Sequence, residues 1–194
     1  SKYLRVRFDE LKQGYSIDVT RPCNSTPHDF TFAAQVFPGT YRISASGYTT
    51  GYSSLPTTPQ VIYDGLTLAK ATPNLVLDVK TAAVSGSVTL NGKTPTFGQY
   101  CKGTSTSKYL RVRFAELKKG YNIDIVRPCN STPHDFTFAG QVFPGTYRIS
   151  ASGYTTGYSD LPTTMQIIDD SLTITQPKAN LLLDIKTVPV SGAV

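Results

Sequence analysis

The chain repeats itself at a fixed spacing of 106 residues. SKYLRVRF begins at Ser1 and again at Ser107, and VFPGTYRISASGYTTGYS begins at Val36 and again at Val142. This offset aligns 88 positions without a gap, and 66 of them are identical. A period of this length is that of a whole small domain, because solenoid repeats are only about 20–50 residues long. We therefore expect a tandem array of like domains.

The offset also predicts domain boundaries. Residues 82–187 make one full period, and residues 1–81 match its last 81 positions. Residues 188–194 (VPVSGAV) match the opening of the period at 82–88 (AAVSGSV). We expect a repeat at 1–81 without its first strand and entry loop, a complete repeat at 82–187, and the first strand of a following repeat at 188–194.

The composition favours strands and turns over helices. Charged residues make up only 16% of the chain, while 15 glycines and 13 prolines are spread along it as turn residues. The net charge of +6 is modest and shared by two repeats, and acidic residues interrupt the basic ones, so nucleic-acid binding is not expected. No stretch of 18 apolar residues is present, so we expect no membrane span.

Alternating hydrophobicity predicts individual strands in the full repeat. In residues 109–117, Leu110, Val112 and Phe114 are expected to face the core, and Tyr109, Arg111 and Arg113 the solvent. Across the Lys119-Gly120 turn, Asn122 and Asp124 are expected on the same wet face as the arginines. Further strands are expected at 84–90, 121–125, 136–138, 147–151, 165–168, 172–174 and 181–185. About eight short strands per repeat predict an all-β fold of tandem Greek-key β-sandwich domains.

Three segments resemble a known family. VSGSVTLNG at Val84, FPGTYRISASGY at Phe143 and LLLDIKT at Leu181 are similar to the carboxypeptidase regulatory-like domain of bacterial surface proteins. That group has a transthyretin-like, Ig-like sandwich related to the B-type repeats of collagen adhesins. The resemblance implies the fold and an extracellular stalk, spacer or adhesive role. It implies no peptidase activity and no cofactor.

The cysteines fit this extracellular expectation. Cys101 and Cys129 lie 28 residues apart in loops of one repeat, without the CxxC or histidine spacing of a metal site. Together with the sandwich fold and the resemblance, this favours a Cys101–Cys129 disulfide and an oxidising compartment. Cys23 is the copy of Cys129, and the partner expected for it lies outside the chain.

Two loop motifs allow alternative interpretations. His134 beside Cys129 and Asp135 could suggest a thiol nucleophile or a metal ligand set, but residues crowded into one Thr-Pro-His-Asp segment are typical of a turn. The loop GYTTGYS carries Tyr48 and Tyr52 in one repeat and Tyr154 and Tyr158 in the other. These rings could bind sugars or proteins, pack between domains, or cover the end of the sandwich.

The resulting hypothesis is a non-enzymatic, extracellular structural protein that forms a bacterial surface stalk or filament. One alternative is an adhesin that binds cell-surface glycans or proteins, and another is an accessory segment of a secreted enzyme. The main expected partner is a further copy or adjoining repeat, joined head to tail. The residues expected to lie against the first domain of another copy are Val190, Ser191, Gly192, Ala193 and Val194. A continuous array and separate strand-donating subunits both satisfy this expectation.

Overall fold

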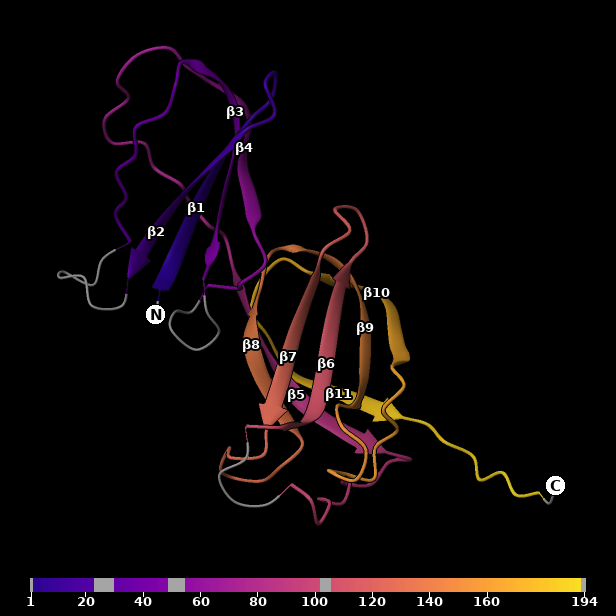
Figure 1. Cartoon of the computed structure of the whole chain (residues 1–194). Helices are drawn as coiled ribbons and strands as arrows, with labels where there is room; N and C mark the ends of the chain where they lie inside the picture. Colours follow the sequence, from indigo (N-terminus) through magenta and orange to yellow (C-terminus); the bar gives the residue numbers. More distant parts are fainter. Residues whose placement is uncertain (1, 23–29, 49–54, 102–105, 193–194) are drawn as a thin grey trace. The chain divides into compact units, whose positions relative to one another are not determined.

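The fold is seen in a computed structural model, which describes residues 2–22, 30–48, 55–101 and 106–192. The chain divides into two compact units, unit 1 (Ser1–Thr81) and unit 2 (Ala82–Val194). The described residues contain strands and no helix, so the predicted all-β class is confirmed (Figure 1).

Unit 1 contains one four-stranded antiparallel sheet. Its strands are β1 (Lys2–Glu10), β2 (Ser16–Pro22), β3 (Gly39–Gly47) and β4 (Gln60–Leu68), in the order β2-β1-β3-β4. Alternating side chains give β1 one buried face, and Gly14, with φ of 74°, closes the hairpin to β2.

Unit 2 contains the same sheet and a second one. The first is built from β6 (Lys108–Glu116), β7 (Asn122–Pro128), β9 (Gly145–Gly153) and β10 (Gln166–Ile174), in the order β10-β9-β6-β7. The second has the order β11-β5-β8, made of β11 (Lys178–Ile185), β5 (Ala82–Leu90) and β8 (Thr137–Val142). Strand β5 pairs antiparallel with β8 and parallel with β11.

The two sheets of unit 2 enclose an aromatic core. Phe114 of β6 lies 6.3 Å, centroid to centroid, from Phe138 of β8 and 6.0 Å from Tyr147 of β9. The hydroxyl of Tyr147 donates to the carbonyl oxygen of Phe143 at 2.6 Å. Each of these four residues is buried, so unit 2 is a closed sandwich.

The hairpin β6–β7 has the predicted register. Arg113 pairs with Asp124 across the strands, and its Nε donates to the carboxylate at 2.7 Å. Val112 is fully buried and Arg111 is not, so the predicted inward and outward faces are confirmed for both. In unit 1, Arg7 lies opposite Asp18 in the same register, and Asp18 pairs with Arg5 at 2.5 Å and with Arg7 at 4.0 Å.

The prediction that Tyr109 faces solvent is wrong. Its side chain is fully buried, and its ring makes edge contacts with Phe97 at 5.0 Å and Phe136 at 5.3 Å. The pairing of β6 with β7 shifts between Lys108 and Leu110, and this irregularity interrupts the alternation. Tyr109 and Leu110 are therefore both buried.

The strand count also differs from the expected eight. The described residues of unit 2 form seven strands, because the segments expected at 165–168 and 172–174 belong to the single strand β10. Two register shifts in β10, at Ile167/Asp169 and Asp169/Leu172, accommodate the polar residues between them.

Candidate functional site

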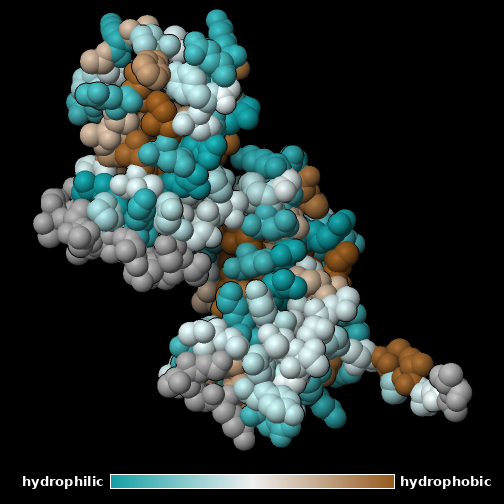
Figure 2. Space-filling model, viewed as in Figure 1, coloured by the Kyte–Doolittle hydropathy of each residue, from teal (hydrophilic) through white to brown (hydrophobic). Residues whose placement is uncertain are grey.

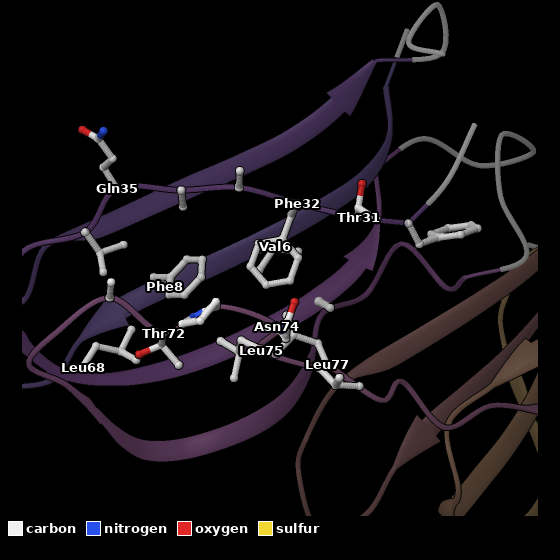
Figure 3. Close-up of a pocket in the computed structure, with 18 of the residues that line it drawn as sticks. Val6, Phe8, Thr31, Phe32, Gln35, Leu68, Thr72, Asn74, Leu75 and Leu77 are labelled. Atoms are coloured by element: carbon white, nitrogen blue, oxygen red, sulfur yellow. The ribbon is translucent and has the colours of Figure 1, made fainter. Parts of the chain in front are cut away.

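Unit 1 has a deep apolar groove over its sheet. The cavity has a volume of about 1310 Å³ and is lined by residues between Leu4 and Val79. Figure 3 shows Val6 and Phe8 of β1 between two bordering segments, one with Phe32 and the other with Leu75. Small-molecule pockets usually measure about 300–1,000 Å³, so this groove has room for a larger occupant.

The bordering segments are copies of two strands of unit 2. Residues 31–36 correspond to β8 and residues 72–79 to β11, yet as described they form no strand in unit 1. In unit 2 those two strands lie on either side of β5. No described residue of unit 1 occupies the place of β5, so the groove coincides with the position of one missing strand.

Side chains along the groove are correspondingly more exposed than their copies. Phe30 is 54% exposed, whereas Phe136 at the same repeat position is 4% exposed. Phe32 and Leu77 are only partly buried, while their copies Phe138 and Leu183 are buried. Figure 2 accordingly shows hydrophobic residues, coloured brown, on the surface of unit 1. Exposed apolar surface of this kind makes the groove a candidate interaction surface.

The described part of the predicted inter-copy strand, residues 190–192, forms no strand within its own unit. Val188 and Val190 are 82% and 91% exposed, and no atom lies within 4 Å of a Cβ placed on Gly192. Ala193 and Val194 lie outside the described residues. The described part of this C-terminal segment is thus extended, apolar and uncovered by unit 2 (Figures 1 and 2).

The structure contains a disulfide between Cys101 and Cys129, the pair expected from the sequence. Their Cα atoms are 5.2 Å apart, and both residues are fully buried. The bond connects the entry loop to the segment after β7. Cys23 lies outside the described residues.

His134 is part of the packing around this disulfide. Its ring stacks on Phe97 at 4.6 Å, and its Nε2 lies 2.9 Å from the carbonyl oxygen of Cys129. That geometry suits a structural turn, because the ring nitrogen donates to the backbone. Among the described residues, no group of three or more His, Cys, Asp or Glu side chains could hold a metal ion.

Asp135 completes the turn. It accepts hydrogen bonds from Thr137 and from Arg127, the latter at 2.9 Å. Burial alone would raise the pKa of Asp135, but the Thr137 hydrogen bonds and the Arg127 charge outweigh burial and lower the pKa. A carboxylate with these partners fixes the loop.

The predicted contact tyrosines differ in their surroundings. Tyr154 is 41% exposed, with Lys108 Nζ 5.0 Å and the Arg111 guanidinium 5.2 Å from its ring centroid. Tyr158 is partly buried and lies 3.5 Å from the Ser107 hydroxyl. Lys2 lies 5.1 Å from the ring of Tyr48.

Tyr158 therefore packs within unit 2, whereas Tyr154 and Tyr48, the latter 46% exposed, remain open to solvent. Tyr52 lies outside the described residues.

Asp184 links the neighbouring strands β11 and β5 of the second sheet. It pairs with Lys186 and accepts hydrogen bonds from Thr89 Oγ1 and Gly92 N, each at 2.8 Å. The Lys186 hydrogen bond, followed by those from Gly92 and Thr89, lowers the pKa of Asp184 to about 2. This carboxylate holds β11 beside the turn that follows β5.

Sequence reasoning predicted that the first repeat would lack a strand but did not identify the residues of the groove. A direct signal was available, because subtracting 106 from the neighbours of β5 in unit 2 gives Phe32, Ala34 and Leu75. That step requires the strand order, which alternation alone does not supply.

Comparisons with known proteins identify no family. No family model matches the chain, and no curated protein matches it. Among solved structures, a leucine-rich repeat protein from Bacteroides thetaiotaomicron aligns with 96% of this chain at 15% identity and a TM-score of 0.34. The chain spans 25% of that protein, and a similarity this low carries no argument about function. No helix among the described residues is long and apolar enough to cross a membrane.

Proposed function

We propose that the chain is part of an extracellular bacterial structural protein, a stalk or filament built from β-sandwich repeats stacked head to tail. The observation that carries this proposal is the repetition of one sheet with the same construction. The strands β1, β2, β3 and β4 recur as β6, β7, β9 and β10 at the offset of 106. The burial patterns of β3 and β9 are identical, and so are those of β4 and β10.

The repetition includes the surface as well as the core. Arg42 pairs with Asp64 at 2.9 Å, and Arg148 pairs with Asp170 at the same distance and repeat position. An enzyme requires one specialised site, whereas an array requires many equivalent surfaces. Repeated exposed pairs therefore favour a structural role over a catalytic one.

The disulfide supports the extracellular part of the proposal. Structural disulfides form and persist in oxidising compartments and are rare in the cytosol. Cys101 and Cys129 are both fully buried, which is the arrangement of a structural bond rather than a redox-active one.

An adhesive role is the second candidate, and Tyr154 is the observation that favours it. An exposed tyrosine ring beside Lys108 and Arg111 offers stacking and positive charge to an acidic sugar or a protein surface. This role is compatible with a filament that also adheres.

Imaging and labelling of native material test the first proposal. We expect antibodies to label intact cells and micrographs to show fibres with a regular axial repeat. Protein confined to the cytosol with reduced Cys101 and Cys129 would contradict the proposal. Binding to a glycan array that Tyr154→Ala abolishes and Tyr63→Ala leaves intact would support the adhesive role.

A further inference from the structure

We infer that the apolar groove of unit 1 is a strand-acceptor site and that its occupant is the C-terminal segment 188–194 of a second copy of this chain. The inference specifies the contact by which copies join, and it rests on the proposed function in taking the neighbour to be another copy.

Unit 2 provides the template for the filled groove. There β5 lies between β8 and β11, and Ala82, Val84 and Val88 point into the core, each no more than 2% exposed. An occupant of the equivalent groove must therefore be an extended strand with small or branched apolar residues at alternate positions. The C-terminal segment offers Val188, Val190 and Val194 at the same three repeat positions.

A glycine requirement makes the match specific. A Cβ on Gly86 would lie 2.0 Å from the carbonyl oxygen of Leu181, so no side chain fits there without moving the backbone of β11. The copy of Leu181 is Leu75, which lines the groove. The residue of the C-terminal segment at the Gly86 position is Gly192, and nothing within its own unit restricts the size of its side chain.

Pro189 is compatible with this placement. The backbone N–H of Val88 donates to the carbonyl oxygen of Phe136 on the β8 side of the strand. Because successive N–H groups of a strand point to opposite sides, the N–H of Ala83, the copy of Pro189, points toward β11. The pairing of β5 with β11 begins only at Val84. A proline at the position before it therefore removes no hydrogen bond between the two strands.

The register follows from the pairing of β5 with β8. Val84, Ser85 and Gly86 lie opposite Gly140, Ala139 and Phe138. By the repeat offset, Val190, Ser191 and Gly192 of the second copy should lie opposite Ala34, Ala33 and Phe32.

Each chain then uses two different surfaces, a groove in unit 1 and a strand from unit 2. Such a head-to-tail contact extends into a filament when its rotation does not close a ring. Backbone pairing would supply affinity, and the valine and glycine positions would supply specificity.

Disulfide trapping tests the register. In unit 2, Ser85 and Ala139 are opposite each other on the outer face, so cysteines at the equivalent places leave the core unchanged. Two variants are mixed, one carrying Ser191→Cys and the other Ala33→Cys, both with Cys23→Ser. We expect a linked heterodimer, because directly opposed residues have Cα atoms about 4.5–5.5 Å apart, within disulfide range.

The register control replaces Ala33→Cys by Gln35→Cys. That position is diagonal to Ser191, about 7–8 Å away, and should link at least about tenfold less. Equal linking of both partners would overturn the register, and linking of neither would overturn the inference. A dilute chain carrying Ser191→Cys and Ala33→Cys together tests capture by the same chain, and a linked monomer would exclude the second copy as occupant.

A matched pair of variants tests the glycine requirement by sedimentation velocity. Gly192→Val should weaken self-association at least about tenfold and leave the melting of unit 2 unchanged. Ser191→Val adds the same side chain on the outer face and should leave association intact. Equal association of both variants would overturn the inference.

These tests are separable from the proposed function. Surface fibres made by a chain that shows no Ser191–Ala33 link would remove the inference and leave the proposal standing. A specific Ser191–Ala33 link in a protein that never reaches the cell surface would support the inference and contradict the proposed function.

Discussion

Phe37 and Phe143 occupy the same position of the two repeats, yet Phe37 is 70% exposed and Phe143 is fully buried. Each ring makes an edge contact with the preceding tyrosine, Tyr15 at 5.9 Å or Tyr121 at 5.7 Å. The local contact is therefore conserved between the units. The difference in burial accompanies the second sheet, which only unit 2 forms among the described residues.

This difference predicts unequal effects of the same substitution. Phe143→Ala should destabilise unit 2 by about 3–5 kcal/mol, because it removes a large buried ring and leaves a cavity. Phe37→Ala should cost unit 1 less than about 1 kcal/mol, because the ring is mostly solvated. Calorimetry of each variant against the unmodified chain measures both. Equal losses would show that the two units are equally closed.

The disulfide should contribute only to unit 2. Replacing Cys101 and Cys129 together by serine should lower the free energy of unfolding of unit 2 by about 2–4 kcal/mol, since the bond closes a loop of 28 residues. Peptide mapping without reduction should recover a Cys101–Cys129 linked peptide. A peptide linking Cys23 to Cys129 in its place would refute disulfide formation within each repeat.

His134→Ala should have a structural effect only. The substitution removes the stacking on Phe97 and the hydrogen bond to the Cys129 carbonyl, so we expect a loss of about 1–2 kcal/mol. His134→Phe retains the stacking and should recover part of this loss. A hydrolytic activity or a stoichiometric bound metal that disappears in both variants would contradict the structural assignment.

Asp184 should make unit 2 sensitive to acid. Its pKa of about 2 in the folded state lies below the usual value of about 3.9, so ionisation stabilises the fold above about pH 4. That contribution should be lost as the pH falls from about 4 toward 2. Urea unfolding of Asp184→Asn should therefore show weaker stability at pH 7 and a flatter dependence on pH in this range.

Thr89→Val serves as the matched control for Asp184, since it removes one of the donors and keeps the carboxylate. We expect it to reduce the acid dependence only in part. An Asp184→Asn variant with the same pH dependence as the unmodified chain would contradict this assignment.

Alternation and repetition predicted much of the fold because they depend on local order. They located strands close to β5, β6 and β9 and the shared outer face of Arg113 and Asp124, since period-two patterns fix which residues face the core. They failed at Tyr109 and β10, where register shifts interrupt the period. The alternating pattern also could not predict the parallel pairing of β5 with β11, because these strands are distant in the sequence.

Residues 31–36 show most clearly what the sequence alone could not predict. They differ from residues 137–142 only in having Ala34 in place of Gly140, yet only the latter form a strand. A Cβ on Gly140 would lie 2.6 Å from Ile125 Cδ1 and 2.9 Å from its Cγ1, and the copy of Ile125 is the smaller Val19, which lacks only the first of these atoms. The smaller Val19 relieves the closest of these contacts, and the difference in structure accompanies β5, a strand with no counterpart among the described residues of unit 1.

Hydrogen exchange as a function of protein concentration tests the central claim most directly. The full chain is compared with a chain ending at Thr187, and exchange is followed in residues 31–36 and 72–79. We predict that protection of both segments rises with concentration in the full chain and stays low in the shortened one. Protection that is equal in the two chains at every concentration would contradict strand donation between copies.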